Sequence, residues 1–347
     1  MMLKPNQKII NAYYHPTSVV FLDDHQAFLD SVPLALEANV AYQSFVDPQK
    51  AIAYINGHTQ YRPLLEQDLQ LTDSGQSYHY KLDSESILHK TLDNKRFSEP
   101  SVLITDYAMP GSNYNGLDVC NAIDNPYVKK ILLTGVADEQ IAIEALNNKV
   151  IDYYLKKNSQ DILPKINELI QQYQQDYFND MTRVVREGLK VSSPLIDDPA
   201  VVGYFFDFIE QKNIVEYHLY TESSPASLDF LLLDEQGKRH RLLLLNKEDI
   251  KAHRDVAADA GAPDALLKTL DSLSSIPLFP SLDGFYHPDM TSDWQNHFYP
   301  STKIHGQEDY LATFIQETAP FPKQTEQSVS LQEYLQGNMA TTSSSTS

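Results

Sequence analysis

The sequence has one cysteine, few basic residues and no long apolar run. A single cysteine excludes a disulfide framework and a cysteine-rich zinc module. No apolar stretch reaches the roughly 20 residues that are needed to span a bilayer. Residues 1–8 also lack the hydrophobic segment of a secretory signal. These absences predict a soluble, cytoplasmic protein that does not act in a membrane.

The shortage of basic residues bears on possible partners. The chain has 27 Lys and Arg against 47 Asp and Glu, for a formal charge of -20. Residues 194–320 contain 9 basic and 21 acidic residues, and no helix-turn-helix pattern is visible there. Proteins that bind duplex DNA need basic side chains to displace the counterions of the phosphate backbone. The composition therefore argues against direct DNA binding.

The length and the order of apolar segments predict two domains. A chain of 347 residues with 42% hydrophobic residues is long enough for two separate cores. In the first half, strand-like runs alternate with helical segments, which indicates a doubly wound parallel sheet with right-handed crossovers. The expected strands are residues 18–22, 42–46, 101–105, 130–133 and 151–155. The expected helices are residues 26–38, shortened at Pro33, and 48–57, 117–123 and 139–147.

Polar residues follow the strands of this predicted sheet, where functional groups of such folds collect. They are Asp23 and Asp24, Asp106, Thr134 and Lys156. One Asp after a strand is most often only a helix N-cap, but capping does not account for the whole set. Carboxylates that lie together need a cation, and oxygen ligands suit Mg²⁺. A carboxylate can also accept a phosphoryl group, which a hydroxyl and a lysine would then bind.

Four segments, in the right order, resemble those of response-regulator receiver domains. They are Asp23-Asp24, the run VLITDYAMP at 102–110 with Gly116 after it, Leu133-Thr134-Gly135, and Tyr153-Tyr154-Leu155-Lys156. The resemblance covers residues 17–172 and implies a (βα)5 receiver fold. With Gly116-Leu117-Asp118 and Glu216-Tyr217-His218-Leu219 included, the pattern is similar to a subgroup of bacterial quorum-sensing regulators whose output domain is poorly characterised.

The resemblance implies a role for each site residue. Asp106 would be phosphorylated by a sensor histidine kinase. Asp24, Asp106 and the backbone carbonyl of Ala108 would bind Mg²⁺, with Asp23 assisting. Thr134 and Lys156 would bind the phosphoryl group, and Tyr153 would be the aromatic residue that rotates on activation. The protein would then be a phosphoprotein that catalyses at most its own phosphoryl transfer and dephosphorylation, and not otherwise an enzyme.

The chain departs from the family pattern at two places. Lys157 follows Lys156 where the family usually has a proline. Asp24 also lies 82 residues before Asp106, whereas strand-helix-strand-helix-strand needs roughly 45. The excess indicates an insertion at residues 58–98, which is either a decorated edge or a partner-docking element. A competing fold, the haloacid dehalogenase class, needs an Asp-x-Asp pair after the first strand, and Asp23-Asp24-His25 does not provide it.

A long helical pattern follows the predicted sheet. Apolar residues three and four positions apart form one stripe through residues 160–190. It is either a core-packing helix followed by a second helix, or a signalling helix that pairs with another copy of the chain. The predicted domains are an extension at 1–16, the receiver at 17–172, a helical linker at 173–193, an output domain at 194–335 and a disordered tail at 336–347.

The output half predicts an α+β domain with an antiparallel sheet. Strand-like runs at 214–220, 227–233 and 239–245 precede helical segments at 247–258 and 265–273, and residues 234–237 form a hairpin turn signal. The basic cluster Lys238-Arg239-His240-Arg241 is either a solvated strand end or an anion site. His287 and His297 are expected to be ordinary surface or core residues.

The function predicted from the sequence is that of a response regulator which forms a homodimer on phosphorylation. The alternative is a receiver that gates an effector enzyme or a small-ligand sensor, with a nucleotide as one possible ligand.

Overall fold

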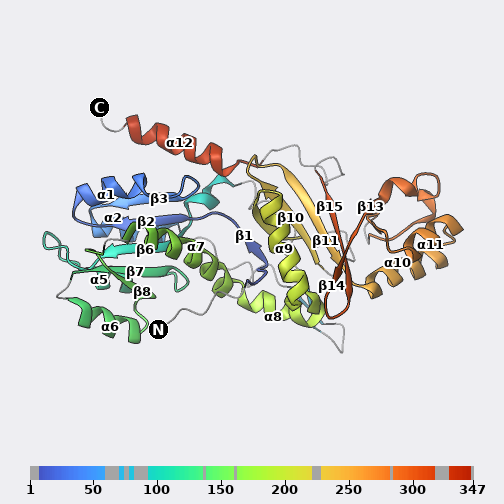
Figure 1. The fold of residues 1–347 in the computed structure, drawn as a ribbon, viewed down its shortest axis with the longest axis horizontal. Helices are drawn as coiled ribbons and strands as arrows, with labels where there is room; N and C mark the ends of the chain where they lie inside the picture. Colours follow the sequence, from blue (N-terminus) through green and yellow to red (C-terminus); the bar gives the residue numbers. More distant parts are fainter. Residues whose placement is uncertain are drawn as a thin grey trace. The chain divides into compact units, whose positions relative to one another are not determined.

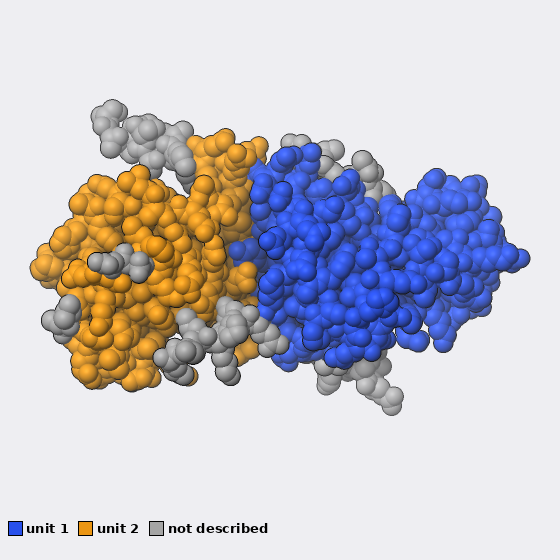
Figure 2. Space-filling model, viewed as in Figure 1, with its two compact units in different colours: residues 1–14, 67–93, 184–330 blue, residues 15–66, 94–183, 331–347 orange. Residues whose placement is uncertain are grey.

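The computed structural model describes residues 8–58, 70–73, 78–81, 93–135, 138–159, 162–220, 228–281, 284–316 and 328–344. The chain divides into two compact units (Figures 1 and 2). The parallel-sheet unit comprises residues 15–66, 94–183 and 331–347, and the antiparallel-sheet unit comprises residues 1–14, 67–93 and 184–330.

The parallel-sheet unit has the predicted doubly wound sheet. Its five strands have the order β3-β2-β6-β7-β8, and every neighbouring pair is parallel. The strands are β2 (Ser18–Leu22), β3 (Ala41–Phe45), β6 (Pro100–Asp106), β7 (Lys129–Thr134) and β8 (Tyr153–Lys156). The central strands β2 and β6 are buried along their whole length, as expected for a sheet that is covered on both faces.

Helices cover both faces of this sheet. They are α1 (Gln26–Ser31), α2 (Pro48–Gly57), α5 (Gly116–Asn121), α6 (Glu139–Asn147) and α7 (Ile162–Met181), with 3-10 turns η1 (Val32–Leu34) and η2 (Asn94–Ser98). One core cluster joins α1 and α7 to alternate strand residues such as Val19 and Ile104. The intervening residues point to the opposite face, where α5 begins against Leu132.

Local sequence signals set two helix ends as predicted. The Asp47 side chain accepts hydrogen bonds from the backbone N–H groups of Gln49 and Lys50, with Pro48 as the first residue of α2. Helix α1 stops at Ser31, and Pro33 lies in the 3-10 turn that follows. A proline inside a helix removes a hydrogen bond and clashes with the preceding turn, so the predicted helix at 26–38 is shortened.

The predicted long helix and its linker need correction. The helical pattern of 160–190 is divided at Thr182 into α7 and α8 (Arg183–Ser192). The stripe of α7 is buried as far as Tyr177 and Met181, and residues up to 183 belong to the parallel-sheet unit. The first of the two alternatives, a core-packing helix followed by a second helix, is therefore confirmed. Residues 173–181 are part of a domain core and not a free linker.

The two ends of the chain also differ from the prediction. Residues 13–14 form β1, which pairs with β9 (Ile214–Leu219), so this part of the extension adds a strand to the antiparallel sheet. Helix α12 (Leu331–Ser344) occupies the segment that was expected to be disordered from residue 336. Its Tyr334 ring packs against Phe97 of η2, with the ring centroids 5.3 Å apart. Helix α12 therefore belongs to the parallel-sheet unit.

The antiparallel-sheet unit contains a six-stranded sheet of order β1-β9-β10-β11-β15-β14. Its further strands are β10 (Leu228–Asp234), β11 (Arg239–Leu245), β14 (Thr302–His305) and β15 (Asp309–Ile315), and a separate pair is formed by β12 (Ser275–Pro277) and β13 (Phe298–Pro300). The sequence predicted β9, β10 and β11 but missed β14 and β15. Gly237, with φ +74°, makes the predicted turn between β10 and β11.

Two clusters pack on this sheet. The helices of the unit are α8, α9 (Pro199–Gln211), α10 (Lys247–Asp259) and α11 (Asp264–Asp271), with 3-10 turns η4 (Pro194–Asp197), η5 (Pro288–Met290) and η6 (Trp294–His297). Phe205 of α9 packs against Tyr217 and Phe230. Helices α10 and α11 form a second core with Leu243, Leu245 and the segment around Trp294.

The predicted insertion at 58–98 is described only in part. The described residues include the antiparallel hairpin of β4 (Gln70–Asp73) and β5 (Tyr78–Lys81) and the turn η2. The rest of the insertion lies outside the described residues, so its two interpretations stay open.

Candidate phosphoacceptor site

The acidic residues predicted from the sequence meet at one edge of the parallel sheet. Asp23 and Asp24 follow β2, and Asp106 is the last residue of β6. Strands β2 and β6 are parallel neighbours, with Leu22 opposite Thr105. Parallel strands that end together place the following side chains at one edge of the sheet. The structure thus confirms that these three carboxylates lie together.

A lysine bridges two of these carboxylates. The Lys157 Nζ lies 2.6 Å from Asp23 Oδ2 and 2.9 Å from Asp106 Oδ2. The Asp23 side chain is fully buried and that of Asp106 is 7% exposed. Buried carboxylates need such a cation, because an unpaired charge is costly away from water. Lys157 therefore provides the positive charge that the sequence analysis assigned to Lys156.

Burial and charge act against each other at Asp106. Burial raises the pKa of the Asp106 carboxyl, the hydrogen bond and charge of Lys157 lower it, and the charges of Asp23 and Asp24 raise it again, so that the pKa ends above its ordinary value. For Lys157, burial lowers the pKa, but the hydrogen bonds to Asp23 and Asp106 prevail and raise it. Lys157 is thus held in its charged form beside Asp106.

The assignment of Lys156 to this site was wrong by one residue. The Lys156 side chain is half-exposed, and its Nζ lies 2.9 Å from Glu139 Oε2 on α6. Successive side chains of a strand point to opposite faces, so adjacent lysines at the end of β8 reach different neighbours. Since Lys157 contacts the carboxylates, the residue that follows the site lysine is Asn158. The departure from the family pattern is therefore Asn158, and not Lys157, in place of proline.

The predicted switch aromatic residue, Tyr153, is also displaced by one position. The Tyr153 ring packs in the cluster that joins the sheet to α1 and α7, so it faces away from α6. By strand alternation, Tyr154 lies on the same face of β8 as Lys156. Tyr154 is therefore the residue of the pair that is placed on the α6 side of β8.

Thr134 is the buried last residue of β7. In the pairing of β7 with β8 it lies opposite Lys156, next to Lys157. Its carbonyl accepts a hydrogen bond from the Lys157 N–H at 3.0 Å, and its hydroxyl donates to the Leu155 carbonyl at 3.4 Å. Thr134 thus reaches the same sheet edge as Asp106. Its hydroxyl is directed at β8 in this structure.

The loop after Asp106 is fixed by a close approach of backbone. The Gly116 N–H donates to the Tyr107 carbonyl at 3.0 Å, and the Tyr107 N–H donates to Leu133 on β7 at 2.9 Å. A Cβ at Gly116 would lie 2.4 Å from the Asp106 carbonyl oxygen, so no other residue fits there without a shift. Ala108, whose carbonyl was predicted as a metal ligand, lies exposed in this loop.

The sequence analysis missed His25. Its Nδ1 lies 2.7 Å from Asp24 Oδ1 and 3.3 Å from Asp23 Oδ1. Potential ligand atoms of Asp23, Asp24, His25 and Asp106 all lie within 4.8 Å of one another. The position of His25 directly after the acidic pair was the available signal. The three carboxylates of this group are the oxygen donors that Mg²⁺ prefers, so the donor set fits the predicted ion.

One solved structure is similar to nearly the whole chain. No family model matches it. The Legionella pneumophila response regulator LqsR has a solved structure that is 30% identical in sequence, covers 94% of this chain and 95% of its own, and superposes with a TM-score of 0.76. The chain belongs to the LqsR-type response regulators.

Two further proteins are similar over part of the chain. The uncharacterized transcriptional regulatory protein YesN of Bacillus subtilis is 28% identical over 195 residues, which are 55% of this chain and 44% of YesN. The chain thus spans less than half the length of that protein. A response regulator receiver domain protein from Clostridium thermocellum is 20% identical, covers 45% of this chain and 95% of its own, and has a TM-score of 0.28.

In this response regulator, most side chains of the basic cluster at residues 238–241 form contacts within the antiparallel-sheet unit. Arg241 forms a buried ion pair with Asp229, and Arg239 Nε donates to the Ser328 hydroxyl at 3.2 Å. His240 Nε2 lies 3.3 Å from Asp234 Oδ2, and only Lys238 is exposed. The cluster is therefore neither a solvated strand end nor an open anion site, because its side chains stabilise β10, β11 and the segment at 328.

Two remaining expectations concern histidines and membranes. His297 packs against Phe279, and among the described residues the candidate metal group includes neither His287 nor His297.

Of the helices in the described part of the chain, none is long and apolar enough to cross a bilayer.

Proposed function

We propose that this response regulator accepts a phosphoryl group on Asp106 from a sensor histidine kinase. In the reaction the N–P bond of a kinase phosphohistidine breaks and a bond forms between phosphorus and a carboxylate oxygen of Asp106, while the imidazole leaves with the electron pair of the N–P bond. The observation that carries the proposal is the contact of Lys157 with the buried pair Asp23 and Asp106. A receiver domain needs this arrangement of acceptor and cation.

Each neighbouring residue has a role in this transfer. Lys157 lowers the pKa of Asp106 against the effect of burial, and its charged ammonium offsets the negative charge that the phosphoryl oxygens bring. The Thr134 hydroxyl, at the neighbouring strand end, turns from the Leu155 carbonyl to a phosphoryl oxygen. Tyr154 lies on the α6 side of β8, where it senses the movement of Thr134. This local charge change alters the partner preference of the α6–β8 surface.

The carboxylates of Asp23, Asp24 and Asp106, with the Ala108 carbonyl, would hold Mg²⁺. These residues would hold an ion that supplies positive charge to offset the negative charge of the phosphoryl group. Asp23 contributes in a second way, because it holds Lys157 in place beside Asp106. The backbone N–H of His25 donates a hydrogen bond to Asp23 Oδ1 at 2.9 Å and so orients this carboxylate.

The wider role is signalling through an output domain that does not bind DNA directly. The net acidity of residues 194–320 and the internal use of the basic cluster support this. The protein acts in the cytoplasm in two-component, quorum-sensing signalling, and its only catalysis is phosphoryl transfer to and from itself. The second candidate, a receiver that gates binding of a small ligand, is favoured by a cavity beside α9 in the antiparallel-sheet unit.

Dimerisation on phosphorylation stays a prediction, but the apolar stripe of α7 is no longer the expected dimer interface. The apolar stripe of α7 is buried in its own unit, so this stripe does not offer a face for a second copy. Light scattering with Mg²⁺, with and without beryllofluoride, measures the mass directly. A doubled mass in the wild type and not in Asp106→Asn supports a phosphorylation-driven dimer through another surface, and an unchanged mass excludes it.

The phosphorylation site is tested by chemical trapping. The full chain is incubated with Mg²⁺ and acetyl phosphate, and the acyl phosphate is then reduced with borohydride, which converts a phosphorylated aspartate to homoserine. Peptide mass spectrometry should find homoserine at position 106 in the wild type and not in Asp106→Asn. Homoserine at another aspartate, or equal labelling of the variant, would overturn the proposal.

A further inference from the structure

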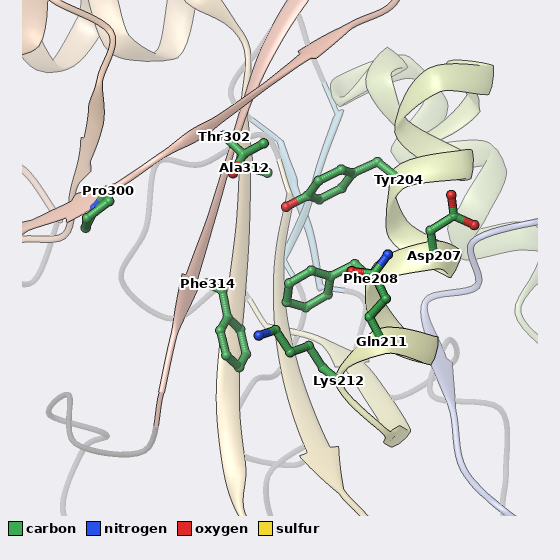
Figure 3. A pocket seen from close by; sticks show the side chains of 9 residues that line it. All are labelled: Tyr204, Asp207, Phe208, Gln211, Lys212, Pro300, Thr302, Ala312 and Phe314. Atoms are coloured by element: carbon green, nitrogen blue, oxygen red, sulfur yellow. The ribbon is translucent and has the colours of Figure 1, made fainter.

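The antiparallel-sheet unit contains a cavity that the phosphoacceptor site does not use. Its volume is about 520 Å³, and it lies beside α9 and the strands β13, β14 and β15 (Figure 3). This volume falls within the range of sites for small molecules. The residues that line it are Tyr204, Asp207, Phe208, Gln211, Lys212, Pro300, Thr302, Ala312 and Phe314.

Three aromatic rings form the apolar wall of the cavity. The rings of Tyr204 and Phe208, one turn apart on α9, stack with centroids 5.9 Å apart at 19°. Phe314 of β15 meets Phe208 edge-on, with centroids 5.1 Å apart at 65°. Tyr204 and Phe314 are only half-buried, so part of each side chain is open to a ligand. Such a surface favours a flat aromatic body, which can stack on one ring and contact the edge of another.

The charge that faces this wall is positive. The Lys212 Nζ lies 5.4 Å from the centroid of the Phe314 ring, and among the described residues Lys212 forms no ion pair. Figure 3 shows the Lys212 ammonium directed toward Phe314, whereas the Asp207 carboxylate points away from Phe208 and Phe314. In a domain of net negative charge, an uncompensated ammonium beside an aromatic wall favours an anionic group.

Polar groups at the margin fix the orientation of a ligand. The Tyr204 hydroxyl, the Thr302 side chain and the Gln211 amide are the uncharged polar groups of the lining. One ammonium and one amide match a singly charged group. They do not match a di- or triphosphate, which needs several donors or a backbone cradle.

We propose that this cavity binds a flat aromatic monoanion, with its ring against Phe208 and Phe314 and its anionic group at Lys212. The inference goes beyond phosphorylation of Asp106 and does not depend on it. It assigns a ligand class to the output domain and argues against a nucleoside di- or triphosphate in this cavity.

The test uses two fluorescent probes of the same shape and different charge. 1-Anilinonaphthalene-8-sulfonate has a flat naphthalene ring system and one negative charge, and N-phenyl-1-naphthylamine is its neutral counterpart. Both are titrated against the full chain, the variant Lys212→Met, and the control Lys251→Met. Lys251 is exposed on α10 and does not line the cavity, so it controls for the loss of one positive charge.

The expected result is a selective loss of anion binding. Lys212→Met should weaken binding of the sulfonate about fivefold, the effect of losing a partly exposed ion pair, and leave binding of the neutral probe within a factor of two. Lys251→Met should behave as the wild type. Phe314→Leu should weaken both probes, because the ring wall serves both.

Equal weakening of both probes by Lys212→Met, or no weakening of either, would overturn the proposal. The same holds if Lys251→Met reduces sulfonate binding as much as Lys212→Met, since the effect would then be one of overall charge. Because Lys212 is exposed, its replacement leaves the core intact, and the result does not depend on how Phe314→Leu folds.

Discussion

We predict that the buried side chain of His253 makes the stability of the antiparallel-sheet unit depend on pH in mild acid. His253 lies on α10 with 1% of its surface exposed, and neither ring nitrogen has a hydrogen-bond partner in the described part of the chain. Its ring packs against Phe285, with centroids 4.8 Å apart. Burial lowers the pKa of His253 from 6.5 to about 4, because the charged imidazolium is disfavoured away from water.

The direction and size of the effect follow from proton linkage. Between pH 6.5 and pH 4 the unfolded chain binds a proton at this position and the folded unit does not, so stability falls as the pH falls. One pH unit corresponds to about 1.4 kcal/mol, which gives a loss of about 3 kcal/mol across the window. At pH 5 the loss relative to pH 7.5 is about 2 kcal/mol. Above about pH 7.5 this group contributes almost no pH dependence, because the histidine is then neutral in both the folded and the unfolded chain.

Urea unfolding of the wild type and His253→Leu measures this contribution. The only tryptophan of the chain, Trp294, belongs to the same core cluster as α10, so its fluorescence reports on this unit. Other groups titrate equally in both proteins, and the comparison removes them. The free energy of unfolding of the variant relative to wild type should rise by about 2 kcal/mol between pH 7.5 and pH 5. A difference that is the same at both pH values would refute the reasoning.

Two further predictions concern a buried ion pair and a close glycine. Asp229→Ala should lower the free energy of unfolding by about 3–5 kcal/mol, because it leaves Arg241 buried without its partner. The double variant Asp229→Leu with Arg241→Met should recover most of this loss in urea unfolding, and a double variant as unstable as the single one would contradict the explanation. Gly116→Ala should slow phosphorylation by acetyl phosphate about 100-fold, because its Cβ would displace the Asp106 backbone. Gly111→Ala, with no atom within 4 Å of the added Cβ, is the matched control, and equal rates in the two variants would count against this account.

The strands and the acidic site could be predicted from the sequence because their signals are local. Apolar runs defined β2, β6 and β7, and the parallel order of the strands followed from the alternation with helices. Asp23 and Asp106 could be placed together because the ends of neighbouring parallel strands meet. These inferences need only the composition of each segment and the rules of sheet topology.

The choice between Lys156 and Lys157 could not be made in this way. Two adjacent lysines end the same strand, and the face that each occupies depends on the pairing of β8 with β7, where Thr134 is opposite Lys156. A shift by one residue exchanges the two faces, and with them Tyr153 and Tyr154. The sequence contains no signal for this register, because Tyr153, Tyr154 and Leu155 are similarly apolar.

Long-range contacts account for the other errors. Strand β1 is two residues long, and its pairing with β9 joins residues about 200 positions apart. Helix α12 has a low-complexity sequence, and its place in the parallel-sheet unit rests on contacts such as Tyr334 with Phe97. The burial of Arg241 depends on Asp229 across the hairpin. Composition alone indicates an exposed strand end there.

The rate of phosphorylation in two lysine variants tests the central claim most directly. Wild type, Lys157→Ala, Lys156→Ala and Asp106→Asn are incubated with Mg²⁺ and acetyl phosphate, and the phosphorylated fraction is followed by phosphate-affinity electrophoresis. Lys157→Ala should be about 10²–10³ times slower than the wild type, as for loss of a group that stabilises developing charge. Lys156→Ala should react at the wild-type rate, and Asp106→Asn should not react. A wild-type rate in Lys157→Ala with a slow reaction in Lys156→Ala would contradict the assignment of the site.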